Sequence, residues 1–215
     1  MRRDLPTSVF VTGTDTGIGK TWVVCQLVRW LSQQGHDIGI QKWVETGWDG
    51  SPTDYDSYLE VLPQLSEMPV EDVVPYRLKF PASPHLAARM ENVSLDFDVC
   101  QRAYNRMISR YECVLVEGAG GCKVPVSMDQ TLVDWIQHMA MPIILVVGNQ
   151  LGCINHTLLT LDVLRHYQLD VQAVVMNDMG VPASAIELDN PSIISQFCSE
   201  KVIVTHGDWC SRIFE

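Results

Sequence analysis

The strand–loop–helix pattern near the start of the chain restricts the fold more than any other feature. The segment reads SVFVTGTDTGIGKT from Ser8 to Thr21. Its first six residues are rich in β-branched and aromatic side chains and end in glycine, which predicts a buried strand. Lys20–Gln33 then carries apolar residues at 23, 24, 27, 28 and 31, which predicts a helix. A strand joined by a glycine-containing loop to a helix that opens on Gly-Lys-Thr is typical of a phosphate-binding loop.

The loop departs from the usual glycine spacing by one residue. The common pattern G-x-x-x-x-G-K-[ST] would need glycine at position 14, where this chain has Thr14, and the glycine is Gly13. Gly13 still ends the strand, so we expect backbone N–H groups to surround phosphate oxygens, Lys20 to reach the β- and γ-phosphates, and Thr21 to ligate Mg²⁺. The alternative is an ordinary strand-to-helix turn. The residues expected to bind ATP here are Thr14, Asp15, Thr16, Gly17, Ile18, Gly19, Lys20 and Thr21.

The remaining apolar segments predict an α/β fold. Strands are expected at 37–44, 112–118, 142–148, 171–177 and 201–206, and helices at about 96–110, 131–139 and 154–168. Strands that are apolar on both faces and alternate with helices indicate a doubly wound, mostly parallel sheet with helices on both faces, similar to the P-loop NTPases. We expect one domain over residues 1–215, with ligands at the C-terminal ends of the strands. Residues 46–84 are expected to form a long, functional connection.

Charged residues stand at the ends of two of these strands, and glycines follow one of them. Glu117 ends one strand and is expected at the sheet edge beside the loop, where an acidic residue holds Mg²⁺ in phosphate-loop enzymes. Gly118, Gly120 and Gly121 would let the backbone approach a ligand. Lys42, at another strand end, would present a second ammonium group, although a lysine in this position is often a solvated surface residue.

A fourth strand end reads NQLGCINHTLL and turns through Gly152 into a helix. The N–H groups at the start of that helix could bind a carboxylate or a phosphate. Asn155 and His156 could equally be ordinary first-turn residues.

Composition makes several partners improbable. The chain carries 15 Lys and Arg against 26 Asp and Glu, a net charge of −11, so we expect neither nucleic acid nor anionic lipid as a partner. Its seven cysteines form no Cys-x-x-Cys pair and fit a reducing compartment. The longest apolar run, MAMPIILVVG, is too short to span a bilayer, and the N-terminus lacks a signal-peptide pattern. A cytoplasmic location is therefore expected.

Taken together, these segments resemble the dethiobiotin synthetases, ligases of the biotin pathway. The family loop G-T-D-T-x-x-G-K-T corresponds to GTDTGIGKT, and the family segment K-P-V-x-[ST]-G resembles KWVETG, with Trp43 in place of proline. VEGAGG and LGCINH match family motifs, PASPHLAA resembles the proline-rich substrate loop, and MND resembles the purine-reading segment. The matching segments run in order from about residue 8 to 178.

The resemblance implies an ATP- and Mg²⁺-dependent cyclisation. One amine of 7,8-diaminopelargonate would take up CO₂ as a carbamate, and the carbamate oxygen would attack the γ-phosphate to give a carbamic–phosphoric anhydride. The second amine would then close the cyclic urea of dethiobiotin and release phosphate. Phosphorylation explains the use of a phosphate loop in a ligase, because it turns a poor leaving oxygen into a good one.

The resemblance also assigns roles to residues. Lys20 and Lys42 would flank the γ-phosphate and the carbamate, Thr46 would contact the carbamate end, and Asn177 would hydrogen-bond adenine. Mg²⁺ would be held by Thr21, by Glu117 and by either Asp54 or Asp56, of which we favour Asp56. The substrate-binding residues would be Lys42, Thr46, Gly118, Ala119 and Gly120, together with Gly152, Cys153, Ile154 and Asn155. These last four would hold the tail carboxylate from the partner subunit of a homodimer.

One segment departs from the family, and two alternative functions compete with the ligase. Many members carry a G-x-I-P segment after the sixth strand, where this chain reads VIVTHGDW, so we expect a more open base pocket. Amidoligases of the cobyrinate-diamide type usually add a glutaminase domain with a nucleophilic cysteine, for which this chain has no room. Regulatory ATPase switches of the partition type need a lysine early in the loop, where Thr14 and Asp15 stand.

Overall fold

A six-stranded parallel sheet forms the centre of the molecule. The computed structural model describes residues 5–50, 52–179 and 184–214. The strand order is β2-β5-β1-β6-β7-β8, and every pairing between these neighbours is parallel. The strands are β1 (Ser8–Gly13), β2 (Ile38–Lys42), β5 (Cys113–Gly121), β6 (Ile143–Gly148), β7 (Val171–Asn177) and β8 (Val202–Val204). All six strand predictions are confirmed, with ends that differ by up to three residues.

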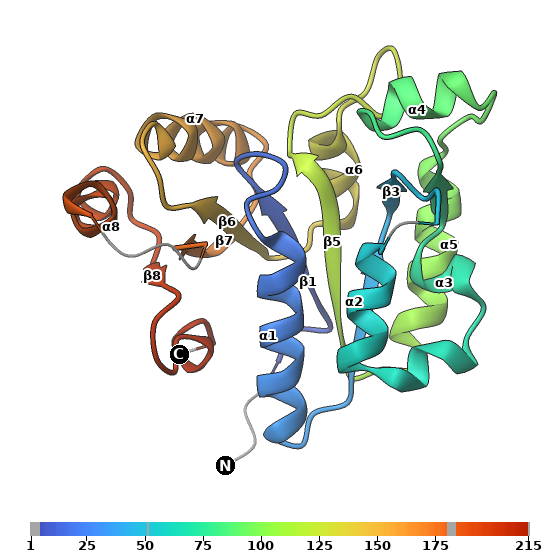
Figure 1. The fold of residues 1–215 in the computed structure, drawn as a ribbon, viewed down its shortest axis with the longest axis horizontal. Coiled ribbons are helices and arrows are strands. Elements are labelled where there is room, and N and C mark those ends of the chain that lie inside the picture. Colours follow the sequence, from blue (N-terminus) through green and yellow to red (C-terminus); the bar gives the residue numbers. More distant parts are fainter. Residues whose placement is uncertain (1–4, 51, 180–183, 215) are drawn as a thin grey trace.

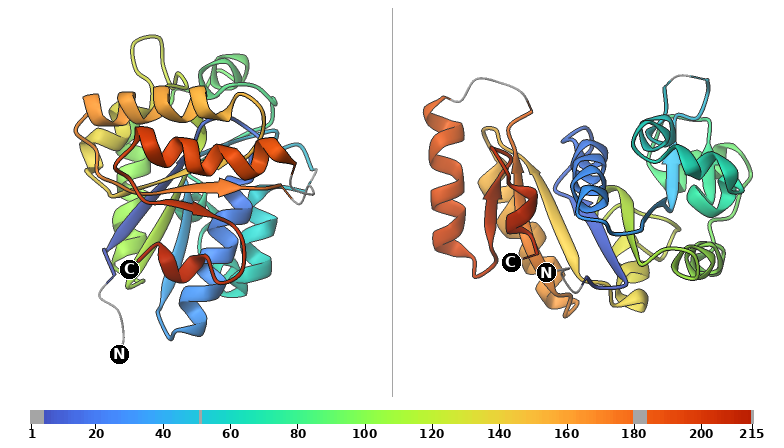
Figure 2. Two further views of the ribbon diagram at one scale, coloured as in Figure 1. Left: turned by 90° about the vertical axis from the view of Figure 1, so that its left-hand side faces the viewer. Right: turned by 90° about the horizontal axis from the view of Figure 1, so that it is seen from below.

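Helices cover both faces of this sheet, as the apolar strands predict. Figure 2 shows α1 on one face and α6 and α7 on the other. This division follows from right-handed crossovers, because the chain moves toward one edge of the sheet after β1 and toward the other edge after β5. The helices outside the β3–β4 region are α1 (Lys20–Gln33), α5 (Phe97–Ile108), α6 (Leu132–Met139), α7 (Cys153–His166) and α8 (Ala185–Phe197). The four expected helices correspond to α1, α5, α6 and α7; α8 was not expected.

The expected strand at 37–44 is divided at Trp43. β2 ends at Lys42, and β3 (Val44–Thr46) pairs with β4 (Tyr76–Leu78) in a separate two-stranded sheet. Trp43 has no exposed surface, and its ring lies 4.9 Å from Phe10 and 6.2 Å from Trp135 between ring centroids. A tryptophan therefore anchors the point where the chain leaves the main sheet.

The prediction of a long connection over residues 46–84 is wrong in its structural part. The described residues of this region form short elements that pack beside α1 and α5 (Figure 1). They bury Tyr58, Leu65, Val73 and Leu78. Burial of this apolar surface offsets the conformational entropy that the short elements lose when they fold. The elements here, besides β3 and β4, are α2 (Asp54–Val61), the 3₁₀ helix η1 (Pro63–Glu67), α3 (Val70–Val73) and α4 (Pro84–Met90).

The end of the chain packs against α1. A 3₁₀ helix η2 (Cys210–Arg212) follows β8, and the Trp209 and Trp22 rings stack with centroids 6.1 Å apart.

The sequence of α8 shows little of the apolar periodicity that predicts a helix. Pro191 lies inside this helix, and its buried residues are Asn190 and Ile194. Among the described residues, no helix has the length and apolar character needed to cross a membrane.

Candidate functional site

A cavity of 560 Å³ lies at the C-terminal edge of the main sheet, where α1 begins and β2 and β5 end. The strand order explains this meeting point, because β5 lies between β2 and β1 and its Glu117 pairs in register with Lys42. The lining residues include Thr16, Gly17, Gly19, Lys20, Thr21, Lys42, Glu45, Thr46, Asp54, Glu117, Ala119 and Gly120. These twelve residues, from four stretches of the chain, therefore line one cavity.

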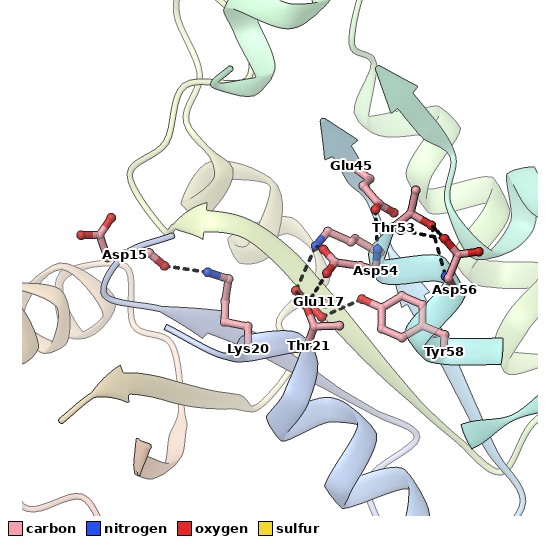
Figure 3. A network of polar contacts seen from close by, with 10 residues as sticks. Asp15, Lys20, Thr21, Glu45, Thr53, Asp54, Asp56, Tyr58 and Glu117 are labelled. Atoms are coloured by element: carbon pink, nitrogen blue, oxygen red, sulfur yellow. Dashed lines mark hydrogen bonds and ion pairs between the residues drawn. The ribbon is translucent and has the colours of Figure 1, made fainter. Parts of the chain in front are cut away.

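Two carboxylates converge on the hydroxyl of Thr21 (Figure 3). Thr21 Oγ1 lies 2.9 Å from Asp54 Oδ1 and 3.0 Å from Glu117 Oε1, so its single proton can be donated to either carboxylate. The three residues come from the starts of α1 and α2 and from β5. Three oxygen-bearing side chains in this arrangement are hard donors of the kind that Mg²⁺ prefers.

Lys42 bridges the same two carboxylates. Its ammonium group forms an ion pair with Asp54 and lies 3.0 Å from Glu117 Oε1. Burial alone would lower the pKa of Lys42, but the charges of Glu117 and Asp54 outweigh burial and raise it above its usual value. Burial acts to raise the pKa of Asp54, but the charge of Lys42 outweighs burial, and the pKa of Asp54 is lowered. The ammonium group of Lys42 and the carboxylate of Asp54 therefore stabilise each other's charged forms.

Lys20 is in a different electrostatic environment. It is 6% exposed, and its Nζ donates to the backbone oxygen of Asp15 at 2.6 Å, within its own loop. Burial lowers the pKa of Lys20 to about 8, and Glu117 opposes this shift without cancelling it. A buried ammonium bound to a loop carbonyl is available to an incoming phosphate, which would restore its usual pKa.

Sequence reasoning missed two buried residues of this site, Tyr58 and Glu45. The Tyr58 hydroxyl donates to Glu117 Oε2 at 2.6 Å, which orients that carboxylate, and burial raises the pKa of Tyr58 well above its usual value. Glu45 Oε1 accepts the backbone N–H of Asp54 at 2.6 Å, and burial raises the pKa of Glu45 to about 7. A carboxylate inside KWVETG was the available signal for Glu45. The sequence carries no such signal for Tyr58, because no local pattern places its hydroxyl beside Glu117, which is 59 residues away in the chain.

The structure does not bring Asp56, the favoured metal ligand, into the cavity, whereas Asp54 lines it. Asp56 Oδ2 accepts the N–H of Thr53 at 2.7 Å and the Thr53 hydroxyl at 2.8 Å, which completes a capping box at the start of α2. Its carboxylate is therefore used in the helix cap, where hydrogen bonds from Thr53 lower its pKa. Asp54 points instead to Thr21 and Lys42.

Asn177, at the end of β7, contacts the phosphate loop rather than the cavity. Its Nδ2 donates to Ile18 O at 2.9 Å. Gly19 beside it has φ +86°, and a Cβ on Gly19 would lie 2.2 Å from Asn177 Nδ2. Only glycine fits both the backbone conformation and this close approach.

The C-terminal segment lies next to the same strand end. His206 Nε2 lies 2.6 Å from Asp178 Oδ2, and Thr205 N donates to Met176 O at 3.1 Å. VIVTHGDW therefore packs beside the expected base site. That this pocket is more open than in other members stays a prediction.

Several expected site residues lie outside the cavity. Gly118 is buried below it, where a Cβ would lie 3.0 Å from Phe10 and Leu132. The backbone of Thr14 donates to Val146 O at 3.1 Å. The other residues that do not line the cavity are Asp15, Ile18, Gly152, Cys153, Ile154 and Asn155. The last four form the cap and first turn of α7, in which Cys153 is buried and Asn155 is exposed.

The fold resembles those of signal recognition particle proteins and of the receptor FtsY. The 54 kDa signal recognition particle protein of Aeropyrum pernix, solved with GDP, superposes with a TM-score of 0.52 at 16% identity, over 95% of this chain and 42% of that protein. Chloroplast FtsY from Physcomitrella patens gives 0.52 at 14% identity, over 96% of this chain and 60% of that one. At such low identity, the likeness concerns the fold alone and confirms the predicted P-loop NTPase-like architecture.

Relatives with more similar sequences identify the family. A family model described as an AAA domain matches residues 7–205. The ATP-dependent dethiobiotin synthetase of Bacillus licheniformis is 36% identical over 191 residues, which cover 88% of this chain and 80% of that protein. The dethiobiotin synthetase of Haemophilus ducreyi is 35% identical over 196 residues, which cover 89% and 92% of the two chains. The chain belongs to the family of ATP-dependent dethiobiotin synthetases.

Proposed function

We propose that this chain catalyses the ATP- and Mg²⁺-dependent ring closure of 7,8-diaminopelargonate with CO₂ to dethiobiotin. The observation that carries the proposal is the meeting of Lys20, Lys42, Thr21, Asp54 and Glu117 in one cavity of a chain from this family. Two ammonium groups and two carboxylates at the mouth of a phosphate loop suit phosphoryl transfer to an anionic acceptor.

The donor set fits Mg²⁺. The Thr21 hydroxyl and the Asp54 and Glu117 carboxylates supply hard oxygen ligands, and the two carboxylates already converge on that hydroxyl at 2.9 and 3.0 Å. We assign the aspartate ligand to Asp54, because the Asp56 carboxylate serves the helix cap. When bound there, Mg²⁺ neutralises charge on the phosphate oxygens of ATP.

The two lysines would stabilise negative charge on different groups. Lys20 would hold the β- and γ-phosphates from within the loop, and Lys42 would face the carbamate oxygen as it attacks the γ-phosphorus and ADP leaves. Thr46 lines the cavity near Lys42 and would contact the carbamate end. In the closing step, the second amine attacks the carbamate carbon, phosphate departs, and the nitrogen loses one proton. Backbone at Ala119 and Gly120 would flank the substrate.

Three further parts of the proposal rest on family membership. Asn177 would hydrogen-bond adenine after leaving its present bond to Ile18 O. Residues 152–155 would hold the tail carboxylate of a substrate bound to the partner subunit, which requires a homodimer. A cytoplasmic location, where ATP and the diamine are both available, completes the proposal.

A product assay tests this function. Purified protein with diaminopelargonate, bicarbonate, Mg²⁺ and ATP is expected to yield dethiobiotin, detected by mass spectrometry, with phosphate release that depends on the diamine. Lys20→Ala is expected to abolish product while the circular-dichroism spectrum stays unchanged. Lys201→Ala is the matched control, because Lys201 donates to Arg212 O near the end of the chain and does not line the cavity. Phosphate release without product, indifferent to the diamine, would favour a regulatory ATPase instead.

A further inference from the structure

Glu45 is a buried carboxylate residue of the cavity, in addition to the two assigned to the metal. It lies in β3 between Lys42 and Thr46, lines the cavity, and is 5% exposed. Figure 3 shows it beside Asp54 at the start of α2. Its Oε1 accepts the N–H of Asp54 at 2.6 Å. Its Oε2 is buried and has no hydrogen-bond partner among residues 5–50, 52–179 and 184–214.

Helix capping explains only one of the two oxygens. The N-terminus of α2 is already capped by Thr53 and Asp56, and Glu45 adds one bond to the first N–H of the helix through Oε1. An acceptor buried without a partner is costly, because it has lost its hydrogen bonds to water. A buried, unpaired carboxylate oxygen on a residue that lines a ligand cavity therefore indicates a donor supplied by the ligand.

The chemistry of the cavity limits which donor this can be. In its ionised form, which a hydrogen-bond donor stabilises, Glu45 accepts hydrogen bonds and repels anions, so it disfavours the phosphates of ATP and the carbamate oxygens as neighbours. Those anions have Lys20 and Lys42 as partners. The amine nitrogens of a vicinal diamine are the remaining groups of the reaction that carry N–H donors.

We infer that Glu45 Oε2 accepts a hydrogen bond from an amine nitrogen of the diamine substrate, which makes Glu45 a substrate-binding residue that orients the nucleophile for ring closure. The inference rests on the proposed function and deepens it. Fixing the nitrogen by one N–H leaves its lone pair free to face the carbamate carbon, and such positioning lowers the entropic part of the barrier.

Glu45→Gln separates substrate binding from capping. Glutamine keeps a carbonyl oxygen for the N–H of Asp54 but replaces the second oxygen with an NH₂ donor. We expect kcat/KM for the diamine to fall about 10- to 100-fold, with the KM for ATP and the melting temperature unchanged. Glu91→Gln is the matched control. Glu91 also accepts a backbone N–H, from Phe80 at 2.9 Å, but it does not line the cavity, so its kinetics should match the wild type.

Other outcomes would overturn the inference. Wild-type kinetics in Glu45→Gln would mean that Oε2 has no ligand, and a raised KM for Mg²⁺ alone would mean that Glu45 serves the metal. If the variant does not fold, a crystal structure of the wild-type protein with the diamine and a non-hydrolysable ATP analogue decides the matter. An amine nitrogen must lie within hydrogen-bond distance of Glu45 Oε2, and water or metal there would contradict the inference. Failure of wild-type protein to make dethiobiotin would instead count against the proposed function.

Discussion

Two buried lysines of the site have pKa values shifted in opposite directions, and their partners explain the difference. Lys42 contacts two carboxylates, so its ammonium form is stabilised and its pKa is raised. Lys20 donates to a neutral backbone carbonyl, so burial dominates and lowers its pKa to about 8. The carboxylates thus hold the charge of Lys42 in place, whereas the charge of Lys20 depends on what the loop binds.

This difference predicts a pH dependence of nucleotide affinity. In the empty site Lys20 loses its proton above a pH of about 8, and bound phosphates would hold that proton. Binding therefore takes up a proton, and the affinity for ATP should fall by up to about tenfold for each pH unit above 8. Titration calorimetry between about pH 7 and 9.5, in buffers that differ in ionisation enthalpy, measures both effects. Lys20→Arg stays charged throughout this range, so the same slope in that variant would contradict the assignment to Lys20.

At the scale of elements, the first turn of α2 gives its two aspartates different tasks. Residues two apart in a helix point in nearly opposite directions, so Asp54 and Asp56 cannot serve the same site. Thr53-x-x-Asp56 is a capping-box pattern, and Asp56 accepts two hydrogen bonds from Thr53. The capping-box pattern is present in the sequence, and it leaves Asp54 rather than Asp56 free to face the cavity.

Substitution of the two aspartates should separate stability from activity. Asp56→Ala removes the capping acceptor and should lower the free energy of unfolding by about 1 kcal/mol with little change in kcat. Asp54→Asn should lower dethiobiotin formation by roughly 100-fold or more at fixed Mg²⁺, because it removes a charged oxygen beside Thr21. Urea denaturation and the product assay measure the two quantities. Loss of activity in Asp56→Ala with full activity in Asp54→Asn would restore Asp56 as the metal ligand.

At the scale of the whole molecule, Trp43 joins the main sheet to the smaller β3–β4 unit. It packs against Phe10 of β1, Phe97 of α5 and Trp135 of α6, with ring centroids 4.9 to 6.2 Å away. The residue before it, Lys42, and the one two positions later, Glu45, both line the cavity. The core and the site are therefore connected through one tryptophan, at the position where the family pattern has proline.

Removal of this ring should destabilise the whole fold. Trp43→Ala is expected to lower the free energy of unfolding by about 3–5 kcal/mol, because it leaves a large cavity among aromatic side chains. Trp22→Ala, which truncates a ring that is 44% exposed, should cost considerably less. Guanidinium denaturation followed by circular dichroism compares the two variants. Equal losses would mean that the Trp43 cluster contributes little to cohesion.

Local sequence was sufficient for the main sheet and for the phosphate loop. Ser8–Gly13 and Lys20–Gln33 carry their own periodicity, so the first strand and helix were predicted to the residue. Residues 46–84 carry no such pattern, because their elements are short and are ordered by packing against α1 and α5. α8 was missed for a related reason, since Pro191 interrupts it and few of its residues are buried.

Local sequence patterns were enough to predict that the loop end at residues 19–21, Lys42 and Glu117 would meet at one edge of a parallel sheet. That result needs only strand ends and the rule that parallel strands share their C-terminal edge. The fold in three dimensions was needed to show that Asp54, and not Asp56, lines the cavity and that the Tyr58 hydroxyl donates to Glu117. It also left Glu45 Oε2 buried and unpartnered within the described residues. Side-chain direction and burial depend on segments distant in the chain, so no local pattern contains them.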